Sequence, residues 1–213
     1  MEGSRWNPDL AGAYDRVAEP YGKQFFDELA RKPFDRELLD RFAARARGRG
    51  PVCDVGCGPG HVGRYLAERG VDVFGLDLSA GMVTLARALN PAMRFEQGDL
   101  RAFSRPDASL AGIVAFYSLI HLERAALADA LVELARVLAP GGLVLIAFHG
   151  GAGEVHADDW FGRGVSIDAT LFHEAEMAAA MDRARLDVEA ITTRAPYEFE
   201  YPTTRVYAAG VKR

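Results

Sequence analysis

A glycine-rich turn is the strongest sign of chemistry in this sequence. Residues 54–60 read Asp-Val-Gly-Cys-Gly-Pro-Gly, after an apolar run and before an amphipathic stretch. Glycine adopts backbone angles that other residues avoid and lets a ligand approach the main chain closely. The free N–H groups at the start of a following helix favour a negative ligand group. The turn therefore predicts a small-ligand site, although such a turn alone does not identify the ligand.

Polar side chains follow the next three predicted strands. Asp77 ends the second strand, 21 residues after Gly56. This is close to the offset of ~20 residues at which an acid contacts a ribose hydroxyl in nucleotide-binding folds. Asp99 ends the third strand, and Tyr117 and His121 follow the fourth. Ligands of open α/β sheets bind outside the carboxyl ends of the strands, so we expect these residues to gather along one edge.

The spacing within the turn separates several ligand classes. A dinucleotide site prefers Gly-x-Gly-x-x-Gly, whereas here Pro59 lies inside the turn and His61 occupies the expected glycine place. No Gly-Lys-Ser/Thr follows, which excludes a P-loop. The acids favour a ligand with a ribose, an adenine, no phosphate and a cationic group, since opposite charge lowers the cost of burying a carboxylate. Cys53 and Cys57 have no partner ligands nearby at zinc spacing, so we expect no metal site.

Short apolar runs alternate with amphipathic stretches, which is the pattern of βαβ units around a parallel sheet. Strands are predicted at residues 51–55, 71–77, 92–97, 110–117 and 143–148, with helices ending near residue 69 and spanning 79–89 and 124–138. Elsewhere we predict two helices within residues 8–48, a loop at 149–169, a helix at 173–185 and an antiparallel strand pair at 188–193 and 205–211. The predicted fold is a Rossmann-like, doubly wound α/β fold. Its mostly parallel sheet ends in an antiparallel C-terminal strand and carries an N-terminal helical cap.

Length and charge narrow the classes of partner. The 213 residues suit a single domain 1–213, with the cap at residues 1–48 and the Rossmann-like core at 51–213. The formal net charge is −5, and an acidic surface does not attract phosphate backbones, so we expect no nucleic-acid partner. Residues 1–8 show no apolar signal segment, and no apolar run reaches the ~20 residues that span a bilayer. We therefore expect a cytoplasmic monomer or homodimer with no membrane partner.

The motifs together resemble those of the class I S-adenosylmethionine-dependent methyltransferases, in particular the small-molecule type. The similar segments are residues 52–60 (first motif), 75–79 with Met82 and Ala86 (second), 98–100 (third) and 139–142 (the lead into the fifth strand). The resemblance covers about residues 51–148 well and the C-terminal strand pair loosely. One departure is Ala111-Gly112, where the family often has an acid early in the fourth strand.

The resemblance implies S-adenosylmethionine as cofactor and S-adenosylhomocysteine as product. It implies that the glycines line the methionine and ribose parts, that Asp77 holds the ribose hydroxyls and that Asp99 accepts from the adenine amino group. With one contact from the N-terminal helices, the expected cofactor residues are Asp54, Gly56, Cys57, Gly58, Gly60, Asp77, Leu78, Met82, Gly98, Asp99, Leu100, Tyr117 and Tyr14.

Methyl transfer from a sulfonium is an in-line displacement, in which the protein mainly aligns the nucleophile; alignment supplies ~7–11 kcal/mol. A base is needed only for an acceptor that is protonated at the working pH. His121 and His149 follow strand ends on the binding edge and are the candidate bases, with a structural role as the alternative for each.

Tyr14 and Tyr21 lie seven residues apart on one helical face, either closing over the site or packing in the core. Tyr21, Trp160 and His121 are the expected substrate contacts.

We therefore expect methyl transfer from S-adenosylmethionine to an oxygen, nitrogen or carbon atom of a small-molecule acceptor, with secondary metabolism as one setting. Two alternatives stay open. One is a non-catalytic S-adenosylmethionine-binding regulator, and the other is an NAD(P)-dependent oxidoreductase on a related fold. The turn spacing and the Gly98-Asp99 element count against the oxidoreductase.

Overall fold

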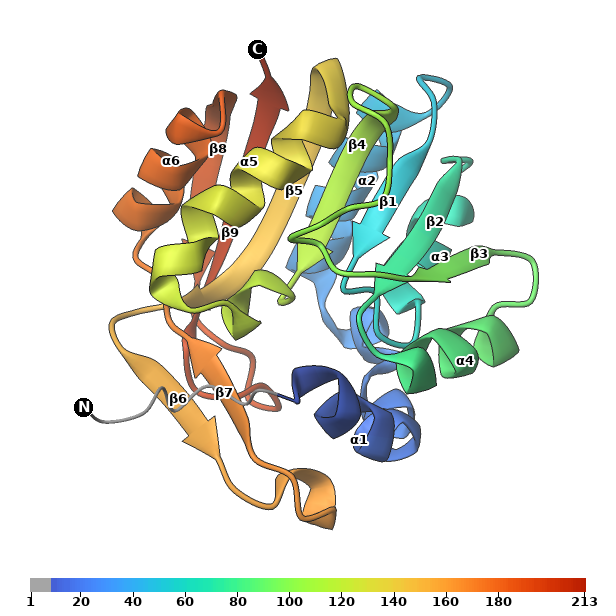
Figure 1. Ribbon diagram of the computed structural model, residues 1–213, viewed down its shortest axis with the longest axis vertical. Helices are drawn as coiled ribbons and strands as arrows, with labels where there is room; N and C mark the ends of the chain where they lie inside the picture. Colours follow the sequence, from blue (N-terminus) through green and yellow to red (C-terminus); the bar gives the residue numbers. More distant parts are fainter. Residues whose placement is uncertain (1–8) are drawn as a thin grey trace.

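A seven-stranded sheet forms the centre of the computed structural model, which describes residues 9–213 (Figure 1). Its strands are β1 (Val52–Val55), β2 (Val73–Asp77), β3 (Arg94–Gln97), β4 (Leu110–Phe116), β5 (Leu138–Gly150), β8 (Leu186–Arg194) and β9 (Thr204–Lys212). They run in the order β3-β2-β1-β4-β5-β9-β8; the first five are parallel, and β9 is antiparallel to both neighbours. Strand order reverses between β1 and β4, where an open α/β sheet forms its ligand crevice. The predicted doubly wound fold is confirmed.

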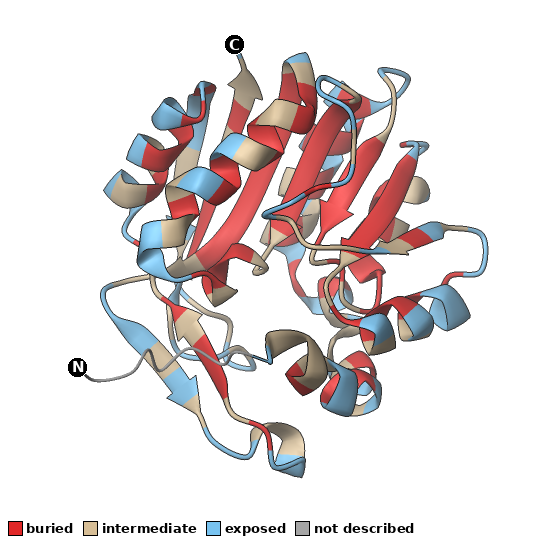
Figure 2. Ribbon diagram, in the orientation of Figure 1, coloured by how far each residue is buried: buried red, intermediate tan, exposed pale blue. Residues whose placement is uncertain are grey.

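Helices cover both faces of the sheet. They are α1 (Leu10–Phe25), α2 (Pro33–Ala46), α3 (His61–Ala67), α4 (Ala80–Leu89), α5 (Leu127–Val137) and α6 (Glu174–Arg183). Leu134 of α5 and Met181 of α6 belong to one buried cluster, while Leu39 of α2 and Leu66 of α3 belong to another. The central strands are buried between these layers (Figure 2). No helix within residues 9–213 is both long and apolar enough to cross a membrane.

The two N-terminal helices have different positions. Pro33 begins α2, where its missing N–H costs nothing, and Leu39 and Phe42 pack this helix against the sheet. By contrast, α1 lies beyond the carboxyl edge of the sheet and contacts α4 (Figure 1). The first eight residues of the predicted cap at 1–48 lie outside the described residues. The division into cap and core stays a prediction, and α1 is the part that reaches over the site.

The segment predicted as a loop at residues 149–169 is instead folded into an antiparallel hairpin. Its strands are β6 (Glu154–Ala157) and β7 (Ile167–Thr170). A cross-strand hydrogen bond of 2.6 Å joins His156 Nδ1 to Asp168 Oδ1. The loop prediction was wrong because four-residue strands between glycine- and aspartate-rich segments give too little alternation to identify from sequence.

The fifth strand begins five residues earlier than predicted. The Pro140-Gly141-Gly142 sequence, expected to separate helix and strand, lies inside β5. Leu138 pairs with Leu110, and pairing resumes at Gly112 and Leu143 after a register shift. Extra residues on one side of a pair are accommodated as a bulge, which the sequence does not distinguish from a turn.

Candidate active site

Asp77 lies at the end of β2, where its carboxylate accepts a hydrogen bond from the glycine-rich turn. Its Oδ2 accepts a hydrogen bond from Gly58 N–H (2.8 Å) and its Oδ1 accepts one from Ser79 N–H (2.9 Å). Gly56 has a left-handed φ of 66°, and a Cβ there would lie 2.3 Å from Ser118 Cβ, so the turn requires glycine. Burial raises the pKa of Asp77 to about 6. A carboxylate in this position gains from further hydrogen-bond donors, such as ribose hydroxyls.

Four predicted cofactor residues are buried, three of them in the turn and one in α4. Asp54 is buried, its Oδ2 accepts from Gly63 N–H (2.9 Å), and burial raises its pKa to about 7. Cys57, Gly60 and Met82 are also buried. Cys57 packs against α4, and direct cofactor contact by any of these four residues stays a prediction.

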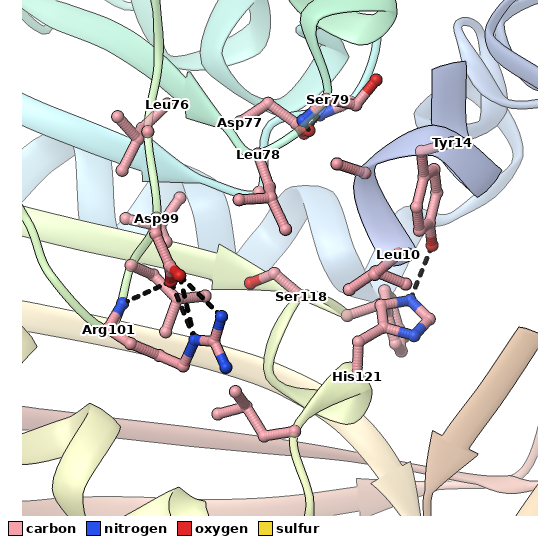
Figure 3. Close-up of a pocket in the computed structure, with 18 of the residues that line it drawn as sticks. Leu10, Tyr14, Leu76, Asp77, Leu78, Ser79, Asp99, Arg101, Ser118 and His121 are labelled. Atoms are coloured by element: carbon pink, nitrogen blue, oxygen red, sulfur yellow. Dashed lines mark hydrogen bonds and ion pairs between the residues drawn. The ribbon is translucent and has the colours of Figure 1, made fainter. Parts of the chain in front are cut away.

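Asp99 follows β3 and forms an ion pair with a neighbouring cation (Figure 3). Arg101 Nη2 donates to Asp99 Oδ2 (2.7 Å), and Arg101 Nε lies 3.0 Å from both carboxylate oxygens. Burial alone would raise the pKa of Asp99, but the hydrogen bonds from Arg101 bring it below its ordinary value. The sequence analysis missed Arg101 because a single charge on a loop carries no motif.

A first cavity of about 870 Å³ runs along the carboxyl ends of β1, β2 and β4, beside the start of α1. The predicted cofactor residues on its wall are Gly56, Gly58, Asp77, Leu78, Gly98, Asp99, Leu100, Tyr117 and Tyr14. Its volume is within the ~300–1,000 Å³ of small-molecule sites. Leu76 and Leu78 give apolar surface near Asp77 (Figure 3), and Leu100 lines the same cavity. Ser118 also lines this cavity, and its buried Oγ has no hydrogen-bond partner among residues 9–213. A ribose beside Asp77 and a flat base among the leucines fit this arrangement.

Tyr117 stands where the first cavity meets a second one. It has a left-handed φ of 56°, which is costly for a non-glycine residue and is stabilised by its N–H donating to Ala147 O (2.8 Å). This backbone turn ends β4 and places the ring on the walls of both cavities. The sequence predicted the position of Tyr117 at a strand end but not its strained backbone.

The second cavity measures about 640 Å³ and lies among α1, the β6–β7 hairpin and residues 198–205. Tyr14, Tyr21 and Trp160 form an edge-to-face cluster on its wall, with ring centroids 5.2–5.8 Å apart. The predicted shared face of Tyr14 and Tyr21 is thus present, and both rings line both cavities. The sequence analysis missed Phe25, which follows Tyr21 at helical spacing and also lines the second cavity.

His121 joins the two cavities and has a defined tautomer. Its Nδ1 lies 2.9 Å from the carbonyl oxygen of Asp168, so Nδ1 carries the hydrogen and donates it. Its Nε2 lies 2.6 Å from the Tyr14 hydroxyl and accepts from it (Figure 3). Burial lowers the pKa of His121 and raises that of Tyr14 well above its ordinary value, so both groups are neutral near pH 7. His121 therefore holds a basic nitrogen at the junction of the cavities.

His149, the other candidate base, lies on the wall of the second cavity alone. Its Nδ1 is within 2.7 Å of Thr203 Oγ1 and 3.0 Å of Arg205 Nη1. Burial, followed by the charge of Arg205, lowers its pKa to about 3. A group this weakly basic, with its lone pair already hydrogen-bonded, is poorly suited to proton abstraction.

A buried network of charges adjoins the second cavity, and its members Lys32 and Glu200 line that cavity. Arg194 donates to Asp35 Oδ2 (2.9 Å) and to Glu200 (2.6 and 3.0 Å), and Tyr207 donates to Asp35 Oδ1 (3.0 Å). Lys32 completes the network with Glu200 at 3.2 Å. Burial alone would raise the pKa of Glu200, but the Arg194 hydrogen bonds and neighbouring cations bring it to about 2. These residues are far apart in sequence, and no local pattern predicts their pairing.

Residues 52–142 match a family of methyltransferase domains. A malonyl-(acyl-carrier protein) O-methyltransferase of Enterobacter lignolyticus (strain SCF1) is 38% identical over 135 residues, covering 63% of this chain and 51% of that protein. A dTDP-3-amino-3,6-dideoxy-alpha-D-glucopyranose N,N-dimethyltransferase of Streptomyces fradiae is 34% identical over 142 residues, covering 66% and 53%. The chain spans about half the length of these curated relatives. The solved structure of a SAM-dependent methyltransferase from Methanosarcina mazei has a TM-score of 0.69 at 18% identity, covering 76% of this chain and 92% of that one.

A cavity at the reversal point of a doubly wound sheet, with a carboxylate ending the second strand, defines a nucleoside-binding α/β domain of Rossmann type. The one-residue shortening of its glycine turn separates it from the dinucleotide-binding members. The match over residues 52–142, together with the methyltransferase relatives and the similar fold, supports a class I S-adenosylmethionine-dependent methyltransferase. S-Adenosylmethionine is the methyl donor of this family.

Proposed function

We propose that this chain transfers the methyl group of S-adenosylmethionine to a small molecule, with the cofactor in the first cavity and the acceptor in the second. The observation that supports this proposal is the shared wall of the two cavities. Tyr14, Tyr21, Tyr117 and His121 contribute to both. At this junction the methyl group of a cofactor in the first cavity could face the nucleophilic atom of an acceptor in the second cavity. A displacement requires this alignment of the two groups.

Asp77 and the glycine turn would hold the cofactor, with its ribose against the carboxylate and its base among the apolar side chains. When bound, S-adenosylmethionine supplies a methyl group activated by the positive sulfonium. The chain contributes alignment, and the packed rings of Tyr14, Tyr21 and Trp160 exclude water from the junction. No metal is required for this chemistry.

His121 is the proposed base for an acceptor that carries a proton. The acceptor O–H or N–H would give its proton to the Tyr14 oxygen, while the Tyr14 proton passes to His121 Nε2 across the 2.6 Å hydrogen bond. The Asp168 carbonyl accepts from Nδ1 and stabilises the imidazolium that forms. Because burial lowers the pKa of His121, this route suits acceptors with acidic protons or good nucleophiles.

The acceptor atom is oxygen, nitrogen or carbon in this proposal. The relatives named above act on an acyl-carrier-protein acid and on an amino sugar, so they support small or carrier-bound acceptors without choosing one. We further propose a monomer or homodimer that acts without nucleic acid.

Calorimetry with S-adenosylmethionine and S-adenosylhomocysteine tests the cofactor, with NAD and NADP as controls and Asp77→Ala alongside. Micromolar binding of the first two, lost in the variant, supports the proposal. Binding of NAD or NADP instead would favour an oxidoreductase. S-Adenosylhomocysteine release across a panel of phenols, amines, carboxylic acids and activated carbon acids then tests turnover. Cofactor binding without turnover on any of them would favour a regulator.

A further inference from the structure

The hydrogen bonds around His149 fix which of its nitrogens carries the hydrogen. An N–H of Arg205 Nη1 points at His149 Nδ1 over 3.0 Å, and a guanidinium only donates. The same Arg205 nitrogen also donates to Thr203 O (2.8 Å) and to Thr203 Oγ1 (2.5 Å), so one of its two N–H groups is shared between two acceptors. Because Thr203 Oγ1 accepts there, its own hydrogen is left for His149 Nδ1 at 2.7 Å. The two hydrogen bonds at His149 Nδ1 therefore agree in direction. Nδ1 holds the lone pair, and in the neutral ring the hydrogen is on Nε2.

The Nε2–H of His149 has no hydrogen-bond partner among residues 9–213. The ring lines the second cavity and lies 5.1 Å from the ring of Tyr117, which borders both cavities. A donor on a cavity wall that no protein group satisfies favours a ligand with an oxygen or nitrogen acceptor. His149 thus presents a donor to the cavity, and not the base expected from its position at a strand end.

The charges at this end of the cavity already neutralise one another. Lys32 lies 2.8 Å from Glu28 and 3.2 Å from Glu200, and Arg205 Nε lies 3.5 Å from Glu200. The charged residues that line the cavity are Glu28, Arg31, Lys32, Glu198, Glu200 and Arg205, three of each sign. A free carboxylate or phosphate would therefore add an unpaired charge to a balanced set.

The wall on the side of α1 and the hairpin is largely apolar. Phe25, Val155, Trp160, Phe161 and Ile167 line the second cavity on the side of α1 and the hairpin. Such a surface fits a ring system or branched hydrocarbon skeleton and offers little to a sugar or an amino acid. The cavity thus combines an apolar body with a donor at its inner end.

We propose that His149 is a specificity-determining residue that donates its Nε2–H to an uncharged oxygen of the methyl acceptor. The acceptor class is a neutral, largely apolar or aromatic molecule with a carbonyl-type oxygen away from the atom that is methylated. The description of this ligand as the methyl acceptor rests on the proposed function. The preference of the second cavity for a ligand with an uncharged oxygen is independent of that function.

Nitrogen-15 NMR of histidine side chains tests the tautomer directly at pH 7. Comparison with His149→Gln assigns the signals of this ring among the five histidines. We expect a neutral ring with hydrogen on Nε2. A ring protonated on Nδ1, or an imidazolium, would overturn the proposal whatever the affinity measurements show.

A matched set of probes tests the preference: 2-acetylnaphthalene, 2-ethylnaphthalene and 2-naphthoate, with affinities measured by ligand-observed NMR. We expect the wild type to bind the ketone about three- to tenfold more tightly than the hydrocarbon, the effect of one neutral hydrogen bond. His149→Gln keeps an N–H donor and should retain a preference, while His149→Phe should reduce the ratio to about one. Calorimetry with S-adenosylmethionine checks that both variants keep a folded first cavity.

Three results would contradict the proposal: equal affinities for ketone and hydrocarbon in the wild type, an unchanged ratio in His149→Phe, or tightest binding of the naphthoate. Failure of the proposed function has a separate signature. In that case the ketone preference would hold while S-adenosylmethionine does not bind, or while no acceptor is methylated.

Discussion

Replacing Asp77 by Asn should change how the stability of the cofactor-free protein depends on pH. Burial raises the pKa of this carboxyl from 3.8 to about 6. Because the folded protein binds this proton more tightly than the unfolded chain, the protonated carboxyl adds to the free energy of unfolding. This contribution is complete below about pH 3.8, the pKa in the unfolded chain, and is lost as the pH rises through about 6, the pKa in the folded protein. At 1.36 kcal/mol per pKa unit the loss is about 3 kcal/mol, of which about 2 kcal/mol falls between pH 4.5 and pH 8.

Urea unfolding of wild type and Asp77→Asn at those two pH values measures this effect. The Asn side chain resembles the protonated acid and does not titrate. The free energy of unfolding of the variant should therefore gain about 2 kcal/mol relative to wild type as the pH rises from 4.5 to 8. Asp72→Asn is the control, because it removes an exposed carboxylate just before the same strand.

A difference between Asp77→Asn and wild type that stays the same at both pH values would refute this account of the buried carboxylate. The affinity for S-adenosylmethionine should change in the opposite direction. Loss of a charged acceptor for the ribose hydroxyls is worth about 1.5–3 kcal/mol, so calorimetry at pH 8 should show binding about ten- to a hundredfold weaker in the variant. A stabilised protein that binds its cofactor poorly is the combination expected of a functional carboxylate.

Three other substitutions, one of them with a matched control, test separate parts of the site. Gly56→Ala should destabilise the protein by about 2–4 kcal/mol through left-handed strain and collision, measured by urea unfolding, whereas Gly153→Ala, with φ 79° and open space around it, should cost only about 1 kcal/mol. His121→Gln should lower kcat about 10²–10⁴-fold with an acceptor that needs a base, while calorimetry shows unchanged cofactor affinity. Arg194→Met should cost about 3–5 kcal/mol in thermal or urea unfolding, because it leaves the buried Asp35 without its cation.

Most of the predicted wall of the first cavity could be located from sequence because its residues are local in sequence. Asp77, Asp99 and Tyr117 each follow a strand that an apolar run marks, and parallel strands bring their carboxyl ends to one edge. The same reasoning gave the sheet and its antiparallel end. It failed at the hairpin, where Asp168 and His156 pair across strands too short to show alternation.

The wall of the second cavity depends on contacts between residues that are far apart in the sequence, and no spacing pattern predicts such contacts. Tyr14 and His121 are 107 residues apart, and Asp35 and Arg194 are 159 apart. These contacts depend on how α1 and the C-terminal strands pack against the rest of the sheet. Both side chains of the Tyr14–His121 pair were proposed from sequence, but their contact was not. The direction of the hydrogen bonds at His149 was equally hidden, because it depends on the guanidinium of Arg205.

The two cavities are formed by parts of the chain that should tolerate amino-acid substitution to different degrees. The wall of the first comes mainly from strand ends and the glycine turn, where a change disturbs the sheet itself. The second is walled mainly by α1, the β6–β7 hairpin and residues 198–205, which lie at the periphery. If the proposed function holds, substitutions on the cavity-facing side of these outer segments should alter acceptor choice while disturbing the central sheet less. Laboratory evolution toward new acceptors should concentrate its mutations there, with library diversity placed at Phe25, Val155 and Phe161 first.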